Sequence, residues 1–253
     1  MGRAIESVAL ERGHRIAGRI HRGDGPGGNR AELDPITDDA VDVVIEFSSP
    51  ESAVTNITYC LERGWPVVSG TTGWLSQRAE VDDLCRRRHG AFFWASNYSI
   101  GVNLFFRLNR TLAKFMHNYP SYRVSMTEIH HTEKKDAPSG TAITLAEGVL
   151  AHQPGKRGWV SRPAKADDAQ TDGSPNNGSR IDATDAVEIE SRRENDVPGT
   201  HTVRYDSAVD RIEITHVAHS RAGFALGAVV AAEWLVGREG VFGMDDLLGK
   251  DEG

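Results

Sequence analysis

The sequence has few features of secreted or membrane-bound proteins. Only two of its 253 residues are cysteines, Cys60 and Cys85, and their spacing does not match the CxxC pattern of redox and zinc sites. Both lie in segments that we expect to be helical, so two buried thiols in a reducing cytoplasm are the favoured interpretation. No apolar run is long enough to cross a bilayer, and no signal-peptide pattern is found. We therefore expect a soluble, cytoplasmic protein.

An excess of positive charge is also missing. The formal net charge is −7, from 29 lysines and arginines against 36 aspartates and glutamates. Nucleic-acid-binding proteins usually show a basic face, so this balance argues against such a partner. The hydrophobic and charged fractions, 39% and 26%, are ordinary for a globular chain long enough for one large or two small domains.

Strand and helix patterns alternate over the first hundred residues. Continuous apolar runs of strand length, such as VDVVIEF (residues 41–47), are typical of strands covered on both faces. This alternation predicts an α/β fold with a Rossmann-like, doubly wound parallel sheet. The expected helices are residues 2–12, 49–63 and 75–88, and the expected strands are residues 14–22, 41–47, 65–70 and 91–96.

A G-x-G-x-x-G fingerprint with its preceding strand is missing from this pattern. The chain opens directly on the first helix, and Gly2 stands where the third glycine would be. One interpretation is another α/β fold that begins with a helix. We favour a recorded sequence that starts inside the glycine loop, because a sheet without its central strand leaves backbone groups of two neighbours unpaired.

Small or polar residues follow each expected strand. In doubly wound sheets, ligands bind at the carboxyl ends of the strands. One polar strand end is weak evidence, but four together favour a nucleotide cleft. These ends are His21-Arg22, Phe47-Ser48-Ser49, Gly70-Thr71-Thr72 and Ser96-Asn97-Tyr98-Ser99.

The pattern changes after residue 99. A helix over residues 101–119 precedes alternating segments that read as half-buried strands, which predicts a second α+β domain with a mixed or antiparallel sheet. A polar stretch at residues 153–183 is expected to be a loop. The apolar helix at residues 224–237 should pack back onto the first domain. The expected strands of this second domain are residues 122–131, 185–195, 199–207 and 210–220.

The stretch EIHHTEKKDAPSGTA (residues 128–142) contains a helix start. Ser139 is a plausible N-cap for a helix over residues 142–150. Gly140 and Thr141 would then present backbone N–H groups without intrahelical partners, and such a helix terminus binds carboxylates.

Cationic groups precede this helix start. His130 and His131 end a strand, and Lys134 follows. Lysine adds positive charge, and histidine titrates near neutral pH. A pocket for a small dianionic substrate with a proton donor is therefore predicted. A metal site is disfavoured because a third ligand and the HExxH pattern are missing. A solvated charged loop is the other alternative, but it does not account for the DAPSGTA continuation.

The motif EIHHTEKKDAPSGTA resembles the signature of the dihydrodipicolinate reductase family, the 4-hydroxy-tetrahydrodipicolinate reductases of diaminopimelate and lysine biosynthesis. The segments VDVVIEFSSPESA, VVSGTTGW, SNYSIGVN, VPGTHTV and HSRAGFALGA are also similar, so the resemblance spans nearly the whole chain. The family's N-terminal strand and first two loop glycines are not present.

The resemblance implies two domains and a homotetramer. Residues 1–99, with 222–253 packed back onto them, would bind the dinucleotide. Residues 100–221 would bind the substrate and build the oligomer. The implied reaction is reduction of a cyclic imine dicarboxylate, with NADPH or NADH as cofactor.

Site residues carry over by position. The resemblance implies catalytic roles for His130, as proton donor or acceptor, and for Lys134. The implied substrate-binding residues are His131, Ser139, Gly140 and Thr141. The implied cofactor-binding residues are Gly2, Arg3, His21, Arg22, Gly70, Thr71, Thr72, Ala95, Ser96, Asn97 and Tyr98.

The expected cofactor preference rests on one departure from the family pattern. Family members often carry an acid for the adenosine ribose, whereas this chain has His21 followed by Arg22. An arginine can accept a 2′-phosphate, which favours NADPH. Two other functions remain open: a non-catalytic relative that binds a dicarboxylate or a partner, if the start is genuine, and another two-domain dehydrogenase acting on an amino-acid semialdehyde or imine.

Overall fold

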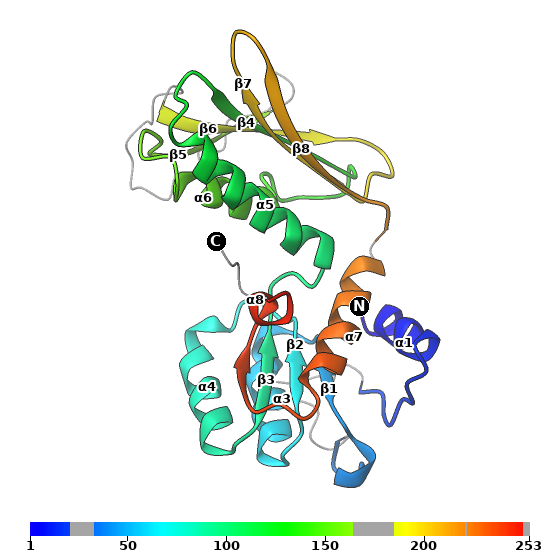
Figure 1. The fold of residues 1–253 in the computed structure, drawn as a ribbon. Helices are drawn as coiled ribbons and strands as arrows, with labels where there is room; N and C mark the ends of the chain where they lie inside the picture. Colours follow the sequence, from blue (N-terminus) through cyan, green and yellow to red (C-terminus); the bar gives the residue numbers. More distant parts are fainter. Residues whose placement is uncertain (21–32, 164–184, 221, 250–253) are drawn as a thin grey trace. The chain divides into compact units, whose positions relative to one another are not determined.

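The computed structural model describes residues 1–20, 33–163, 185–220 and 222–249 (Figure 1). The chain forms two compact units. Unit 1 consists of Met1–Ile100 and Ala222–Gly253, and unit 2 of Gly101–Arg221. Within the described residues, no helix has both the length and the hydrophobicity that crossing a bilayer requires.

Unit 1 contains a parallel four-stranded sheet with the order β1-β2-β3-β9. Its strands are β1 (Val44–Glu46), β2 (Val67–Ser69), β3 (Ala91–Trp94) and β9 (Gly240–Phe242). Its α-helices are α1 (Gly2–Glu11), α3 (Pro50–Glu62), α4 (Arg78–Arg87), α7 (Ala222–Leu235) and α8 (Met244–Leu247), and the short 3-10 helices are η1 (Asp38–Ala40) and η2 (Leu75–Gln77).

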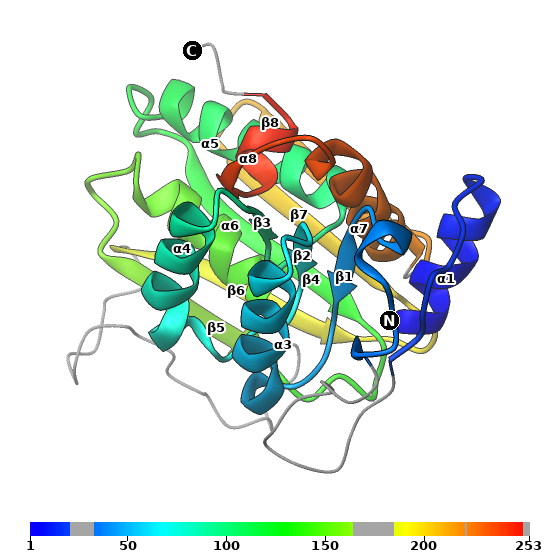
Figure 2. The ribbon, with the colours of Figure 1, turned by 90° about the horizontal axis from the view of Figure 1, so that it is seen from below.

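Helices cover both faces of this sheet (Figures 1 and 2). Successive side chains of a strand point to opposite faces. Val67 therefore packs with the apolar residues of α3 and α4, whereas Val68 packs with those of α1 and α7. Both valines are fully buried. The predicted doubly wound arrangement is confirmed, and the last apolar helix packs on this unit as expected.

Two predictions about strands in unit 1 need correction, and one further strand was not predicted. Residues 14–20 form no strand, so the strand predicted at 14–22 is wrong for its described part. Strand β1 at Val44–Glu46 is shorter than the predicted 41–47 and lies at the end of the strand order. Extended backbone is stabilised by pairing, and no described residue pairs with the outer edge of β1. Strand β9, which has only three residues, was not predicted.

Unit 2 contains a mixed five-stranded sheet with the order β5-β6-β4-β7-β8. Strands β5, β6 and β4 are parallel, whereas β4, β7 and β8 are antiparallel. Helices α5 and α6 lie on one face, and Phe105 and Val149 pack there against Ile189 and Val203. The elements are α5 (Ile100–Met116), β4 (Arg123–His130), α6 (Gly140–Leu150), β5 (Gly158–Pro163), β6 (Ala186–Arg193), β7 (Gly199–Asp206) and β8 (Arg211–Ala218).

The polar stretch predicted as a loop at residues 153–183 contains a strand. Its described part includes β5, which pairs with β6 in parallel, so the loop prediction is wrong there. Residues 164–183 lie outside the described residues. The pairing register of neighbouring strands shapes the site in this unit: β4 places Glu128 opposite His201 of β7, and His130 opposite Arg193 of β6.

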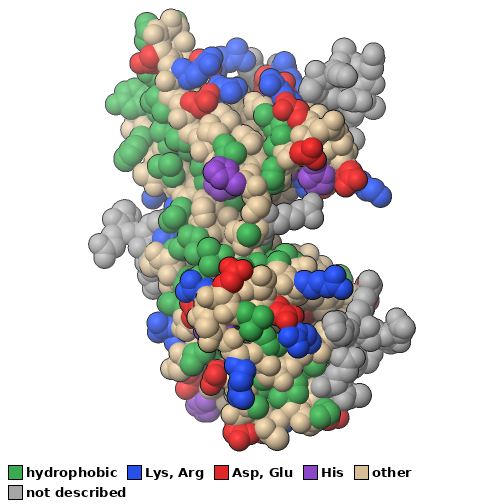
Figure 3. Space-filling model, turned by 90° about the vertical axis from the view of Figure 1, so that its right-hand side faces the viewer, with side chains coloured by type: hydrophobic (Ala, Val, Ile, Leu, Met, Phe, Trp, Pro, Cys, Tyr) green, Lys and Arg blue, Asp and Glu red, His purple; other side chains and the backbone are tan. Residues whose placement is uncertain are grey.

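Charges of both signs are interspersed on the surface. On the face shown in Figure 3, lysine and arginine side chains lie among aspartates and glutamates. Several pairs contact each other directly, for example Arg204 with Glu213 at 2.5 Å and Arg211 with Asp206 at 2.9 Å. Opposite charges therefore offset each other locally at these positions.

Candidate active site

A buried carboxylate lies at the centre of the site in unit 2. In β4, alternate residues point toward α5 and α6, and this inward row begins with the apolar residues Val124 and Met126. Glu128 continues the row and is 0% exposed. Its two carboxylate oxygens accept hydrogen bonds from the backbone N–H of Ser139, at 3.2 and 3.0 Å. The carboxylate therefore fixes the residue that precedes α6.

Ser139 is the N-cap of α6, as predicted. Its hydroxyl oxygen accepts a hydrogen bond from the backbone N–H of Ala142 at 3.2 Å and is hydrogen-bonded to Nε2 of His201 at 3.1 Å. Gly140 and Thr141 are the first residues of the helix, so their N–H groups have no intrahelical acceptors. A Cβ on Gly140 would meet nothing within 4 Å, which leaves open space for an anion at this terminus.

His130 is packed against the same cluster. It is 7% exposed, and its ring centroid lies 4.9 Å from that of His201. A Cβ on Gly199 would lie 3.2 Å from Nε2 of His130, so a larger residue on β7 would crowd the ring. Nδ1 lies 3.5 Å from a carboxylate oxygen of Glu128 and makes no hydrogen bond with any described residue. The ring is thus held by packing, with its buried Nδ1 facing the carboxylate of Glu128.

The electrostatics of the cluster follow from burial. Burial lowers the pKa of His130, while the charge of Glu128 acts in the opposite direction. Burial also lowers the pKa of His201, to about 4, with the neighbouring His130 adding to the effect. Burial alone would raise the pKa of Glu128, but hydrogen bonds from Ser139 bring it below its ordinary value. Glu128 is therefore ionised and His201 neutral at pH 7.

Lys134 lies in the segment between β4 and α6. Its ammonium group donates to both carboxylate oxygens of Asp136, at 2.7 and 2.8 Å. This interaction lowers the pKa of Asp136. His131, immediately after β4, is half-buried. The structure thus connects His130 and Ser139 through Glu128 and His201, whereas the charge of Lys134 is paired with Asp136.

The cluster also has a donor set that can bind metals. Glu128, His130 and His201 each offer one ligand atom, and these three atoms lie within 4.8 Å of one another. Histidine and carboxylate groups are common zinc ligands. However, the carboxylate already accepts the Ser139 N–H, and the guanidinium of Arg193 lies 3.5 Å from it. A neighbouring cation disfavours a divalent ion electrostatically. The geometry fits proton transfer and anion binding better.

Several of the cofactor candidates lie at strand ends of unit 1. The carboxylate of Glu46, 6% exposed, accepts hydrogen bonds from the Ser48 N–H at 2.9 Å, from Ser69 Oγ at 2.6 Å and from Thr71 Oγ1 at 2.9 Å. It therefore joins the carboxyl ends of β1 and β2. Thr72 is exposed beside them.

Other candidates turn their side chains inward. Tyr98 is 2% exposed and its hydroxyl donates to the Ser69 carbonyl at 2.7 Å. Ala95 is buried, and a Cβ on Gly70 would lie 2.1 Å from the ring of Phe47. Ala95 and Tyr98 are buried as whole residues and offer little surface to a ligand, whereas Gly70 offers half-buried backbone.

The remaining cofactor candidates include exposed positions and positions outside the described residues. Ser96, after β3, is exposed, and Asn97 is half-buried with its side-chain oxygen accepting the Ser99 N–H at 2.9 Å. Gly2 and Arg3 begin α1. His21-Arg22 lie outside the described residues. Polar side chains and accessible backbone at the ends of adjacent parallel strands fit a nucleotide.

Sequence reasoning missed the residues that connect the site. Glu128 and His201 were given no role, and neither was Arg193. A signal existed for the first two: each lies at a core-facing position of an alternating strand, where apolar residues are expected. A buried polar side chain at such a position needs partners. No comparable sequence signal pointed to Arg193. The residue opposite Arg193 in the sheet depends on which strands pair, and the sequence pattern does not show this.

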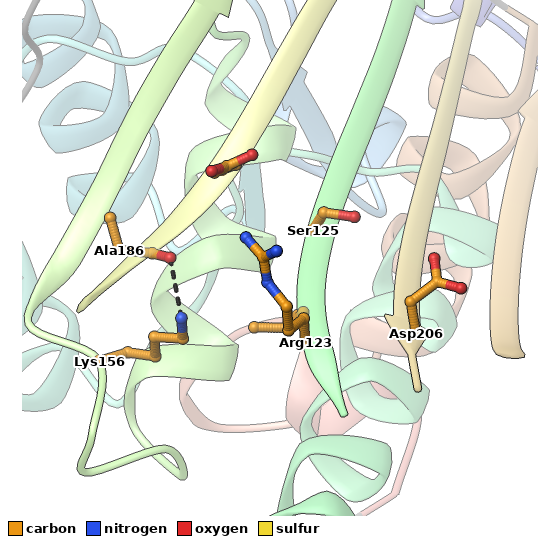
Figure 4. Close-up of a pocket in the computed structure, with 7 residues that line it drawn as sticks. Arg123, Ser125, Lys156, Ala186 and Asp206 are labelled. Carbon is orange, nitrogen blue, oxygen red and sulfur yellow. Dashed lines mark hydrogen bonds between the residues drawn. The ribbon is translucent and has the colours of Figure 1, made fainter. Parts of the chain in front are cut away.

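A cavity of about 240 Å³ lies elsewhere in unit 2 (Figure 4). It is near Arg123, which begins β4, whereas His130 ends that strand. Lys156 lines it and donates to the Ala186 carbonyl at 3.2 Å. Glu188 also lines it, so cations and anions are mixed and the cavity does not suit a dianion. None of the predicted catalytic or substrate-binding residues lines it.

Comparison with known proteins gives a consistent result. Residues 1–98 match the family model "Dihydrodipicolinate reductase, N-terminus" and residues 101–248 match "Dihydrodipicolinate reductase, C-terminus". A 4-hydroxy-tetrahydrodipicolinate reductase of Christiangramia forsetii is 44% identical over 98% of this chain and 93% of its own length. That of Oleidesulfovibrio alaskensis is 38% identical over 94% and 87%.

A solved structure shares the fold. The dipicolinate-bound dihydrodipicolinate reductase from Paenisporosarcina sp. TG-14 superposes with a TM-score of 0.71 at 18% identity, covering 97% of this chain and 94% of that one. The likeness covers both units.

Proposed function

The chain belongs to the dihydrodipicolinate reductase family, and on this premise we propose that it reduces 4-hydroxy-tetrahydrodipicolinate to tetrahydrodipicolinate with NADPH or NADH. Unit 1 is the dinucleotide-binding domain, and unit 2 binds the substrate. Nothing in the comparisons favours a non-catalytic relative. The two family models together also displace the alternative of an unrelated dehydrogenase.

One observation carries the proposal most directly. The start of α6 and the ring of His130 belong to a single buried cluster, because Glu128 accepts the Ser139 N–H and lies 3.5 Å from the imidazole. A helix N-terminus binds carboxylates, and a protonated histidine can donate a proton. A group that binds an anion and a group that donates a proton are therefore held together, as reduction of a dicarboxylate imine requires.

Each residue has a defined task in this reaction. The N–H groups of Gly140 and Thr141 bind a substrate carboxylate, and His131 contacts the other end of the diacid. Lys134 exchanges its ion pair with Asp136 for the substrate and stabilises the charge that develops on reduction. His130 donates the proton, and the 4-hydroxyl group of the substrate leaves as water. The bound nicotinamide supplies the hydride.

Cofactor contacts come from unit 1. The exposed Thr72 and Ser96 and the backbone at Gly70 and Ala95 would hold the nicotinamide end of the cofactor, and the N-terminus of α1 would bind its phosphates. Glu46 maintains this arrangement through its hydrogen bonds to Ser69 and Thr71. We propose that Arg22 accepts a 2′-phosphate, so that NADPH is preferred. A lower KM for NADH than for NADPH would contradict that preference.

The wider setting of the reaction follows from the family. We propose that the enzyme acts in cytoplasmic diaminopimelate and lysine biosynthesis. It would form a homotetramer through the face of the unit 2 sheet that lies opposite α5 and α6. Light scattering of the purified chain would give the mass of the assembly.

Steady-state kinetics test the function. The imine is generated enzymatically, and consumption of NADPH is followed with and without it. His130→Gln should lower kcat by about two to four orders of magnitude and leave nucleotide affinity nearly unchanged. His219→Gln is the control, because His219 is exposed and lies beyond the end of β8. The proposal would be refuted if the wild type consumed NADPH no faster with the imine than without it.

A further inference from the structure

The segment that carries Lys134 is held from the side by an arginine. Arg193, the last residue of β6, donates from Nε to the Lys134 carbonyl at 3.2 Å and from Nη2 to the Asp136 carbonyl at 2.6 Å. Its side chain is 22% exposed. One planar guanidinium thus spans two carbonyls of the turn from which the Lys134 ammonium projects.

The same segment is held at its end by Glu128. The carboxylate accepts the Ser139 N–H, and its Oε1 lies 3.5 Å from Nη1 of Arg193. The two contacts are joined through this ion pair, with Glu128 fully buried. The middle and the end of residues 131–139 are therefore positioned by one connected pair of side chains.

Strand pairing does not need either side chain. Both strands keep their backbone ladders, since β6 lies between β5 and β4, and β4 between β6 and β7. The side chains instead contact the intervening segment, and Glu128 also lies 3.5 Å from the ring of His130. Arginine is suited to this task because its rigid fork offers donors at fixed angles, which the single ammonium of lysine does not. A buried carboxylate destabilises a protein unless well-placed partners pair with it and hydrogen-bond to it.

We propose that Glu128 and Arg193 are positioning residues, which together set the place of Lys134 and of the N-terminus of α6 for binding and protonation of the diacid. This inference rests on the proposed function. Neither residue has to touch the substrate, because each acts through the main chain of residues 131–139.

The test compares two neighbouring arginines. Arg193→Lys keeps the charge and loses the fork, whereas Arg192→Lys makes the same exchange one position earlier, where the side chain points to the other face and bonds Glu190 at 2.9 Å. For Arg193→Lys, kcat/KM for the imine should fall about a hundredfold, with an unchanged KM for the nucleotide. Arg192→Lys should stay within about twofold of the wild type, since exposed ion pairs contribute little.

Two further readouts separate positioning from loss of structure. Pyridine-2,6-dicarboxylate, as a non-reacting diacid, should bind Arg193→Lys at least about tenfold more weakly while the unfolding midpoint of the variant stays above the assay temperature. Methylguanidine at millimolar concentration should restore part of the activity of Arg193→Ala. It should restore none of the activity of Lys134→Ala. If Arg193→Lys does not fold, Glu128→Gln is compared with Glu190→Gln in the same assays.

The outcomes distinguish the two proposals. Wild-type kcat/KM in folded Arg193→Lys, or equal losses in the Arg192 and Arg193 variants, would overturn the positioning role. An inactive wild type that still binds the diacid would refute the proposed reaction, and the diacid affinities of the variants would then decide the positioning role by themselves.

Discussion

The backbone carbonyl of Tyr98 occupies the position where a side chain on Gly227 would lie. A Cβ built on Gly227, in the middle of α7, would be 1.7 Å from that oxygen and 2.7 Å from the carbonyl carbon. Both atoms are backbone, so they cannot move aside as a flexible side chain would. Gly227 thus allows α7 to approach the chain that follows β3, where Ser96 and Asn97 are cofactor candidates.

Gly227→Ala should therefore destabilise unit 1 although alanine favours helices. Overpacking typically costs about 1–3 kcal/mol, and a displaced strand end should also raise the KM for the nucleotide. Gly223→Ala on the same helix is the control, because its Cβ would lie 3.7 Å from Ser99 Oγ, an ordinary contact. That variant should be neutral or more stable by up to about 1 kcal/mol. Thermal unfolding of the two variants tests this prediction. Equal unfolding midpoints would contradict the close approach of Gly227 to the Tyr98 carbonyl.

Replacing Lys134 should reduce turnover much more than replacing its neighbour. Lys134→Ala should lower kcat by about two orders of magnitude or more, because it removes the cation beside the reacting atoms. Lys135→Ala removes the same charge from an exposed side chain and should stay within about twofold. The turnover rates of the two variants are compared at saturating concentrations of nucleotide and imine. An unaltered rate in Lys134→Ala would remove this lysine from the mechanism.

The fall of kcat/KM with rising pH should occur at a pH below the ordinary pKa of histidine. His130 must be protonated to donate, and burial lowers its pKa, so kcat/KM should fall as pH rises through that lowered pKa. The charged groups facing the ring act in both directions. Glu128 and Asp136 raise the pKa of His130, and Lys134 and Arg193 lower it.

Glu128→Gln should shift this limb of the profile to still lower pH, because it removes the carboxylate that favours the charged imidazolium. His201, whose ring also packs against His130, is neutral above its own pKa of about 4. Glu190→Gln changes a half-buried glutamate of β6, which pairs with Arg192, and serves as the control. A profile that moves to higher pH in Glu128→Gln would contradict the assigned role of the carboxylate.

Stability should fall as pH drops below 6.5. His201 has a pKa of about 4 in the folded protein, against an ordinary value near 6.5 when unfolded. Above pH 6.5 the ring is neutral in both states. Between pH 6.5 and 4 the unfolded chain binds a proton that the folded chain does not, so this group alone lowers the free energy of unfolding by about 3 kcal/mol.

Urea unfolding between pH 4 and 7 measures this dependence. The pH slope should be shallower in His201→Gln, which has no ring to protonate. His219→Gln replaces an exposed histidine of the same unit and should keep the wild-type slope. Identical slopes in all three proteins would show that His201 is not held neutral by burial.

Local patterns predicted much of the fold. The helix at Pro50–Glu62 follows from Ser49, Pro50 and the stop at Gly64, whose φ of +74° suits glycine. Short or unpaired segments were less predictable. Strand β9 has three residues, too few for a periodic signal, and β5 lies in a polar stretch that reads as a loop.

The sequence by itself determined the local chemistry of the site: a strand that ends in two histidines, and a helix capped by Ser139 with Gly140 and Thr141 at its start. Such features depend on contacts between residues a few positions apart. Only the tertiary structure decided that His201 lies opposite Glu128 and Arg193 opposite His130. Pairing across a sheet depends on which strands become neighbours and in which register, and that follows from packing of the whole unit.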